Sequence, residues 1–171
     1  MVGTDPLRTG ELRHIRHFRR APDGRTVLRM AEDNRNRRIV VGVDGSANSQ
    51  KAVAWSITNA HPGDTVVLLT GWHPVVPPPE MAVAYADDDS AMRTVLVRET
   101  AKARDLAAGT KVSIESKFEH VDPRTALMDE KCDMIVVGSR GHSGIAGLLL
   151  GSTTDYVARH AKVPIVIVPS V

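Results

Sequence analysis

Cysteine is nearly absent from the sequence, and so are long hydrophobic runs. The single cysteine, Cys132, excludes an internal disulfide framework. No apolar run approaches the roughly 18–20 residues that span a bilayer, and the first residues lack the apolar centre of a signal peptide. We therefore expect a protein of the reducing cytoplasm, in which Cys132 is an inert core residue beside an apolar run.

Net charge is also small. The chain has 22 basic and 20 acidic residues, a formal charge of +2, with 42% hydrophobic and 25% charged residues. Residues 1–36 contain eight arginines and five acidic residues, so this segment holds the positive charge and the rest of the chain is close to neutral. The balance is typical of an ordinary globular domain and argues against nucleic acid as its main partner.

Residues 1–36 are interpreted as a basic N-terminal extension outside the domain. Leu12, Ile15 and Phe18 recur every third residue among arginines, which is a weak basic amphipathic pattern. The sequence at residues 21–24 predicts a turn. Binding to a membrane surface, to nucleic acid or to a partner all stay open for this segment, which we expect to be poorly ordered.

Several catalytic and nucleotide-binding motifs are missing. There is no Gly-x4-Gly-Lys-Ser/Thr P-loop, no Gly-x-Gly-x-x-Gly after the first predicted strand, and no Gly-x-Ser-x-Gly nucleophile elbow. His14 and His17 have no third ligand nearby, so we predict no metal site. No convincing general base or arginine finger is present, and no catalytic residue is assigned.

Four continuous apolar runs are typical of strands buried on both faces, as in a parallel sheet between layers of helices. They occupy residues 39–43, 65–69, 134–137 and 164–168. Residues 111–118 alternate polar and apolar side chains instead, which predicts an edge strand with one wetter face.

Helical patterns lie between these runs, over about residues 47–60, 90–108, 123–130 and 152–160. The second helix is predicted to bury a stripe that includes Leu106, and Ser152 with Asp155 forms a capping-box pattern. The alternating order predicts an α/β domain over residues 37–171. We expect a doubly wound, five-stranded parallel sheet flanked by helices, with strand order 3-2-1-4-5.

The chemistry concentrates in a glycine-rich segment after the fourth strand, where five glycines fall within residues 138–151. Gly138 and Gly141 allow sharp turns and leave amides open to an anion. Gly151 and Ser152 present the first amides of the last helix, which suit a phosphate group. The alternative interpretation is that these glycines only end strands and begin helices.

A second half-site follows the first predicted strand, at Asp44. In doubly wound sheets the first and fourth strands lie side by side, and ligands bind outside their carboxyl ends. Asp44 and Gly138 each follow one of these strands, so the topology predicts that they meet. We interpret Asp44 as a contact for ribose hydroxyls or a base, with a turn or cap role as the alternative.

The pattern Gly-x2-Gly-x9-Gly-Ser, at Gly138, Gly141, Gly151 and Ser152, resembles the ATP-binding signature of the universal stress protein family. The resemblance covers about residues 37–171 and implies ATP as the ligand, with any Mg²⁺ held mainly by phosphates and water. It implies adenine and ribose contacts at Gly42, Val43, Asp44 and Gly71. It implies phosphate contacts at Gly138, Ser139, Arg140, Gly141, His142, Gly151, Ser152 and Thr153.

The same resemblance implies a nucleotide-dependent regulatory switch in the stress response, with ATP hydrolysis slow at best. A cyclic-AMP-binding stress protein and a ligand-free dimeric adaptor are the alternatives. Members of the family commonly form homodimers through the last strand, here Pro164 to Val168, whose apolar edge would otherwise invite uncontrolled pairing. An unidentified regulatory protein is the other partner that we expect.

Overall fold

The chain divides into two compact units, residues 1–35 and residues 36–171. The computed structural model describes residues 17–20, 26–29, 36–73, 89–141 and 150–170. Within those five ranges, no helix is long and apolar enough to cross a membrane.

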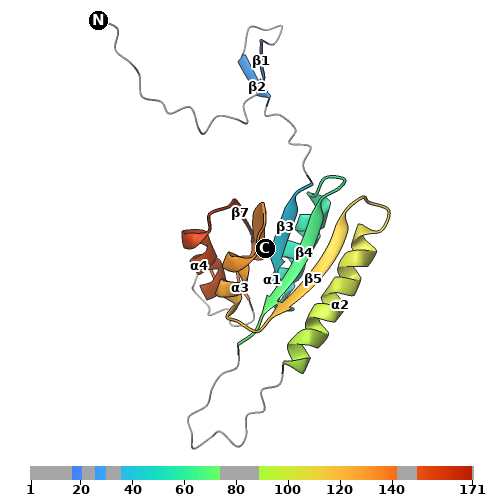
Figure 1. Cartoon of the computed structure of the whole chain (residues 1–171), viewed down its shortest axis with the longest axis vertical. Helices are drawn as coiled ribbons and strands as arrows, with labels where there is room; N and C mark the ends of the chain where they lie inside the picture. Colours follow the sequence, from blue (N-terminus) through green and yellow to red (C-terminus); the bar gives the residue numbers. More distant parts are fainter. Residues whose placement is uncertain (1–16, 21–25, 30–35, 74–88, 142–149, 171) are drawn as a thin grey trace, which may run out of the picture. The chain divides into compact units, whose positions relative to one another are not determined.

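A parallel sheet forms the centre of the larger unit (Figure 1). Its strands are β3 (Arg38–Gly42), β4 (Thr65–Gly71), β5 (Ser113–Glu119), β6 (Met134–Gly138) and β7 (Ile165–Val168). Their order across the sheet is β5-β4-β3-β6-β7, and every pairing is parallel. The predicted fold class and the strand order 3-2-1-4-5 are therefore confirmed.

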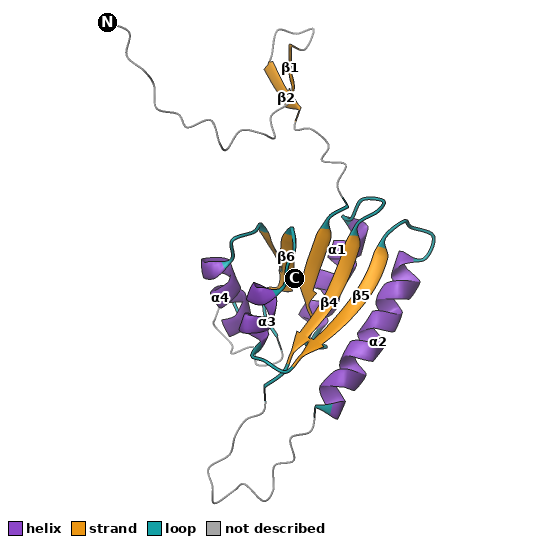
Figure 2. Ribbon diagram, in the orientation of Figure 1, coloured by secondary structure: helices purple, strands orange, loops and turns teal. Residues whose placement is uncertain are grey.

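Helices cover both faces of this sheet (Figure 2). They are α1 (Ala47–Thr58), α2 (Ser90–Ala107), α3 (Pro123–Asp129) and α4 (Ser152–His160). Ile39 and Val41 of β3 belong to the core on the α1 and α2 side, whereas Val40 belongs to the core on the α3 and α4 side. Because alternate side chains of a strand point to opposite faces, burial of both faces explains the continuous apolar runs in the sequence.

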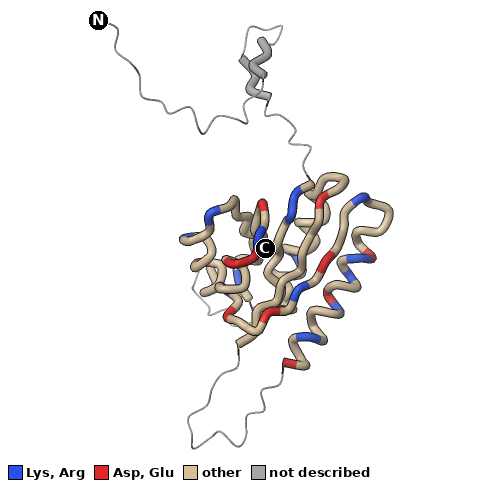
Figure 3. Tube along the Cα trace, in the orientation of Figure 1, with Lys and Arg blue, Asp and Glu red and all other residues tan. Residues whose placement is uncertain are grey.

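Strand β5 lies at an edge of the sheet and has the wetter face that its alternating sequence predicts. Four of its seven residues are exposed, while Ile114 and Phe118 pack against the core. Figure 3 shows both signs of charge along β5 and none along β4. Lys117 of β5 pairs with Glu130 at 2.7 Å. Charged side chains on an edge strand oppose pairing with another chain.

The predicted burial of Leu106 is wrong, because this side chain is 52% exposed. The buried positions of α2 advance in steps of three or four residues from Leu96 through Ala103 to Ala107, as helical periodicity requires. Glu99 lies on the same inward face and is also buried. A carboxylate therefore lies on the buried face of α2, which the sequence pattern described only as an apolar stripe.

The smaller unit contains an antiparallel pair of strands that the sequence pattern did not indicate. These strands are β1 (His17–Arg20) and β2 (Thr26–Arg29). Phe18 lies in β1, in register with Leu28 of β2. It is therefore part of a strand and not of the amphipathic pattern, repeating every third residue, that the sequence analysis described. The predicted turn at residues 21–24 lies outside the described residues.

Candidate functional site

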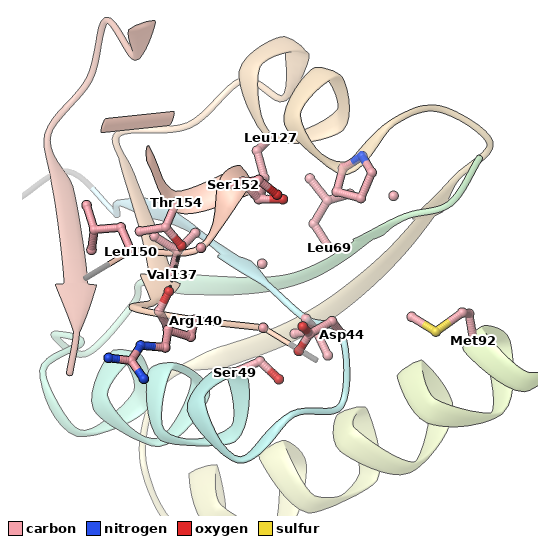
Figure 4. A pocket seen from close by; sticks show the side chains of 18 residues that line it. Asp44, Ser49, Leu69, Met92, Leu127, Val137, Arg140, Leu150, Ser152 and Thr154 are labelled. Carbon is pink, nitrogen blue, oxygen red and sulfur yellow. Dashed lines mark hydrogen bonds between the residues drawn. The ribbon is translucent and has the colours of Figure 1, made fainter. Parts of the chain in front are cut away.

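A cavity of about 460 Å³ opens at the carboxyl ends of β3, β4 and β6, against the start of α4 (Figure 4). Its described lining consists of Gly42, Val43, Asp44, Ser49, Leu69, Gly71, Met92, Pro123, Leu127, Val137, Gly138, Arg140, Gly141, Leu150, Gly151, Ser152, Thr153 and Thr154. Ten of the twelve site residues predicted from the sequence are among them. Ser139 is not a lining residue, and His142 lies outside the described ranges.

The two predicted half-sites meet because β3 and β6 are neighbours in the sheet. Val41 of β3 is in register with Val136 of β6, so the chain leaves both strands at the same edge of the sheet. Asp44 follows β3, and the segment from Gly138 to Gly141 follows β6. This juxtaposition at the point where the winding reverses is the arrangement in which α/β sheets place ligands.

Hydrogen bonds fix the loop that carries Asp44. The backbone N–H of Val43 donates to the carbonyl oxygen of Leu69 at 2.9 Å, and the next residue, Asp44, begins a tight turn. The Asp44 carboxylate accepts the N–H of Ser46 through Oδ1 at 2.9 Å. Gly45 between them has φ +84°, a conformation that favours glycine. Asp44 is thus both a turn residue and a lining residue of the cavity.

The cavity glycines are required for different reasons. A β-carbon on Gly71 would lie 2.6 Å from the Cα of Pro123, and one on Gly138 would lie 2.7 Å from the carbonyl carbon of Asn48. Close packing of the backbone therefore explains these two glycines without any ligand. A β-carbon on Gly141 would overlap Oδ2 of Asp44. Glycine at position 141 therefore allows the Asp44 carboxylate to keep its position.

Gly151 differs from Gly71, Gly138 and Gly141. Among the residues that the structure describes, a β-carbon there would come no closer than 3.4 Å to another atom, the Cα of Arg140. Its φ of −73° and ψ of 159° are also open to any residue. Internal packing therefore gives no reason for glycine at this position, whereas an approaching ligand would.

The start of α4 forms one wall of the cavity. Gly151 is the N-cap and supplies no side chain to the first amides of the helix. The N–H of Gly151 donates to the carbonyl oxygen of Ser139 at 2.8 Å, and Thr154 Oγ1 donates to that of Gly138 at 2.8 Å. These bonds attach α4 to the end of β6. As a result, the start of α4 is directed at the cavity. The first N–H groups of a helix have no partner within the helix and carry a partial positive charge.

The predicted capping box at Ser152 and Asp155 is wrong, although the predicted helix bounds are correct. Ser152 is the first residue inside the helix and the N-cap is Gly151. Asp155 pairs instead with Arg159 one turn later, at 2.9 Å. A capping box requires the serine hydroxyl to be at the N-cap. Here the helix begins one residue earlier than that pattern requires, so Ser152 is inside the helix and not at its N-cap.

The side chain of Arg140 extends away from Asp44 and Ser152 in Figure 4. Its Nε is buried and has no hydrogen-bond partner among the described residues, and the same is true of Ser139 Oγ. The backbone of Ser139 is well held, since its N–H donates to Val168 of β7 at 2.7 Å. A phosphate contact from the Arg140 guanidinium requires another rotamer and stays a prediction.

Sequence reasoning missed the apolar part of the cavity. Leu69, Leu127 and Met92 come from three different elements, β4, α3 and α2. They converge only after the sheet and helices have packed, so no motif in the sequence marks them. Ser49 and Thr154 were missed as well, although helical periodicity places them near Ser46 and Gly151. The cavity is therefore apolar toward β4 and α3 and polar toward the start of α4.

Charge in the cavity comes from few groups. Asp44 and Arg140 are the only charged side chains among the lining residues that the structure describes. Just outside it, Arg124 hydrogen-bonds the carboxylate of Asp122, the N-cap of α3, and lowers the pKa of Asp122 to about 2. That carboxylate therefore stays ionised at neutral pH.

The described residues contain no group of three or more histidine, cysteine or acidic residues placed to hold a metal ion.

Comparison with known proteins gives relatives of one kind. A universal stress protein of Mycobacterium tuberculosis is 29% identical over 159 residues, which cover 82% of this chain and 50% of the relative. The chain thus spans about half the length of the curated relatives that it matches first.

Solved structures give the same result. A universal stress protein in complex with cAMP is 28% identical, with a TM-score of 0.58, and the match covers 80% of this chain and 98% of that one. A universal stress protein family member from Arabidopsis thaliana with AMP bound is 18% identical, with a TM-score of 0.53 and coverage of 78% and 91%. This second likeness shows the shared fold alone.

The sequence profile of the universal stress protein family matches residues 35–169, which include every strand of the parallel sheet and all four helices. The match also spans both half-sites of the cavity, from Asp44 to Thr154. The chain belongs to the universal stress protein family.

Proposed function

We propose that the chain binds ATP in this cavity, with adenosine near Asp44 and the phosphates at Gly141 and the start of α4. The observation that carries the proposal is that one cavity joins a carboxylate after β3 to the amides that open α4. Ribose hydroxyls donate to carboxylates, and helix N-termini attract phosphate. Leu69 and Leu127 offer an apolar surface for the base.

In this proposal the bound nucleotide is a regulatory signal in the stress response, read by an unidentified partner protein. A ligand that binds only one of two states, at about 100 times its dissociation constant, stabilises that state by about 2.7 kcal/mol, which is enough to shift the equilibrium between them. Hydrolysis is slow at best, because the described lining residues include no histidine and only one carboxylate. The phosphates and water would hold most of any Mg²⁺ that accompanies ATP.

The direct test is to denature the purified protein and identify any released nucleotide by mass spectrometry. We expect ATP or its hydrolysis products in the wild type and less in Asp44→Ala. A parallel assay of phosphate release measures hydrolysis, and turnover faster than about one per minute would contradict a regulatory role without dedicated catalysis.

Cyclic AMP is a second candidate ligand. The solved relative in complex with cAMP is 28% identical to this chain and matches 98% of that structure's length. In addition, Arg140 is the only basic residue among the described lining residues, and its side chain extends away from Asp44 and Ser152 in Figure 4. A competition titration distinguishes the two ligands by which displaces the other at lower concentration.

We also propose a homodimer through β7. This strand is at the edge of the sheet, where β6 is its sole described partner. Ile165, Val166 and Ile167 are each only partly buried in the single chain, and an apolar strand edge favours strand addition. Sedimentation velocity should give a species of twice the 18.5 kDa chain mass. A monomer at all concentrations up to about 100 µM would contradict this proposal, since obligate dimers bind far more tightly.

A further inference from the structure

Glu99 of α2 is a buried carboxylate at some distance along its helix from the cavity. The residue is 3% exposed. Its Oε1 accepts hydrogen bonds from Arg98 Nε at 3.0 Å and Lys102 Nζ at 3.1 Å. Both donors lie on the same helix and are more than half exposed, so these pairs would form equally well on the surface. They give no reason for burying the carboxylate, which costs free energy unless it is paired.

Gln50 of α1 supplies that reason. Its Nε2 donates to Glu99 Oε1 at 3.3 Å and to the carbonyl oxygen of Gly45 at 3.4 Å. A side-chain amide has two N–H groups, so each acceptor takes one of them. Gln50 thus connects α2 with the loop between β3 and α1.

The carbonyl that Gln50 holds belongs to a particular peptide group. The peptide unit between Gly45 and Ser46 has the Gly45 carbonyl on one side and the Ser46 N–H on the other. That N–H donates to Asp44 Oδ1 at 2.9 Å. Because a peptide unit is planar, fixing its carbonyl also fixes the direction of its N–H. Gly45, at φ +84°, has unusual backbone freedom and does not fix the plane by itself.

We propose that Gln50 and Glu99 are positioning residues that set the orientation of the Asp44 carboxylate through the Gly45–Ser46 peptide. The effect on ligand affinity rests on the proposed function. The structural step, in which Gln50 and Glu99 orient Asp44 through the Gly45–Ser46 peptide, does not. The Glu99 carboxylate orients the Gln50 amide, the amide holds the Gly45 carbonyl, and the peptide N–H holds Asp44. A loss of Gln50 therefore acts on the adenosine end of the cavity and leaves the start of α4 unchanged.

The first test is amide hydrogen exchange of Ser46 in the full chain without nucleotide. Exchange should be about tenfold faster in Gln50→Ala than in the wild type, as expected for the loss of one supporting hydrogen bond. Lys102→Ala is the matched control, because it removes a partner of Glu99 that does not contact Gln50, and Ser46 should exchange as in the wild type. Equal exchange in the wild type and Gln50→Ala would overturn the structural step whether or not the protein binds ATP.

The second test is a double-mutant cycle on ATP affinity, measured by calorimetry on nucleotide-stripped protein. Gln50→Ala should weaken ATP binding about tenfold in the wild-type background and by less than about twofold in the Asp44→Ala background. Glu99→Gln should retain wild-type affinity, since its amide oxygen still accepts from Gln50, whereas Glu99→Ala should behave like Gln50→Ala. An equal loss in both backgrounds would show that Gln50 acts independently of Asp44 and would overturn the proposal.

The two proposals fail in different ways. If wild-type protein gives no heat with ATP or cAMP, the proposed function fails, and the exchange of Ser46 alone decides the positioning role. If the wild type binds ATP and Gln50→Ala binds it equally well, the positioning role fails and the proposed function stands.

Discussion

The Cα of Gly141 faces the carboxylate of Asp44 so closely that a β-carbon on Gly141 would overlap Oδ2. These two residues follow different strands, β6 and β3, and are 97 positions apart in the sequence. Glycine at position 141 therefore matters without any ligand, because its missing side chain allows the carboxylate to keep its place beside the cavity.

Gly141→Ala should weaken ATP binding by about tenfold or more, because the new methyl group displaces Asp44 as well as crowding the phosphate. Asp44→Ala should have an effect of similar size. The double variant should bind no more weakly than the weaker single variant, since the Asp44 carboxylate can be lost only once. Calorimetric titration of the three variants measures this, and fully additive losses would show that the two residues act separately.

Gly151→Ser should separate stability from binding. Serine is a better N-cap than glycine, and a β-carbon fits at this position, so the melting temperature should stay the same or rise. The added side chain stands at the start of α4 within the cavity, and we expect ATP affinity to fall by about tenfold or more. Thermal unfolding and calorimetry on the same sample give both readouts.

Gly138→Ala is the matched comparison, because its β-carbon would collide with the backbone of Asn48. We expect it to lose about 1–3 kcal/mol of stability through overpacking. If Gly151→Ser loses as much stability as Gly138→Ala, or keeps full affinity for nucleotide, then glycine at position 151 serves the fold rather than a ligand.

Acid should destabilise the protein in part through Asp64. This carboxylate is 1% exposed and accepts the backbone N–H groups of Arg37 and His61, each at 2.8 Å. Burial alone would raise its pKa, but hydrogen bonds from the Arg37 side chain and from those amides outweigh burial and lower the pKa below its ordinary value of 3.8. The folded state therefore binds this proton less tightly than the unfolded state does.

The stabilising contribution of Asp64 is thus complete above the unfolded pKa of 3.8 and is lost as the pH falls through the lower folded pKa. Asp64→Asn should lower the free energy of unfolding by about 3 kcal/mol at neutral pH, as breaking a buried pair does. The difference from the wild type should shrink below about pH 4. Asp155→Asn, which breaks an exposed pair with Arg159, is the control and should change little. A constant difference across the acid range in urea titrations would contradict this role.

The sheet could be predicted from the sequence because its signals are local. Residues 39–43 and 134–137 are apolar throughout, and only a strand buried on both faces explains so short an apolar run between turns. The helix between Ser46 and the next strand was equally clear, and Ser46 caps it by accepting the N–H of Ser49 at 3.2 Å. Topology then brought Asp44 and Gly138 to the same edge.

Features that depend on contacts between distant segments could not be predicted. The close approach of Pro123 to Gly71 exists only after α3 has packed on β4. From the sequence alone, a glycine required by packing could therefore not be distinguished from one required by a ligand. Likewise, nothing near Glu99 in the sequence indicates Gln50, which lies 49 positions away. The hairpin of β1 and β2 was missed because arginines interrupt its apolar alternation, and a pattern that repeats every third residue was read there instead.

The most direct test of the central claim is a calorimetric titration of the nucleotide-stripped full chain with ATP and with cAMP. The meeting of Asp44 with the start of α4 in one cavity predicts saturable binding of ATP in the micromolar range, weakened by about tenfold or more in Gly151→Ser. If cAMP binds more tightly than ATP, the proposed nucleotide site stands, but its ligand is cAMP and not ATP. No heat with either nucleotide, from protein that unfolds cooperatively, would contradict nucleotide binding and leave a dimeric adaptor that has the family's glycines without their ligand.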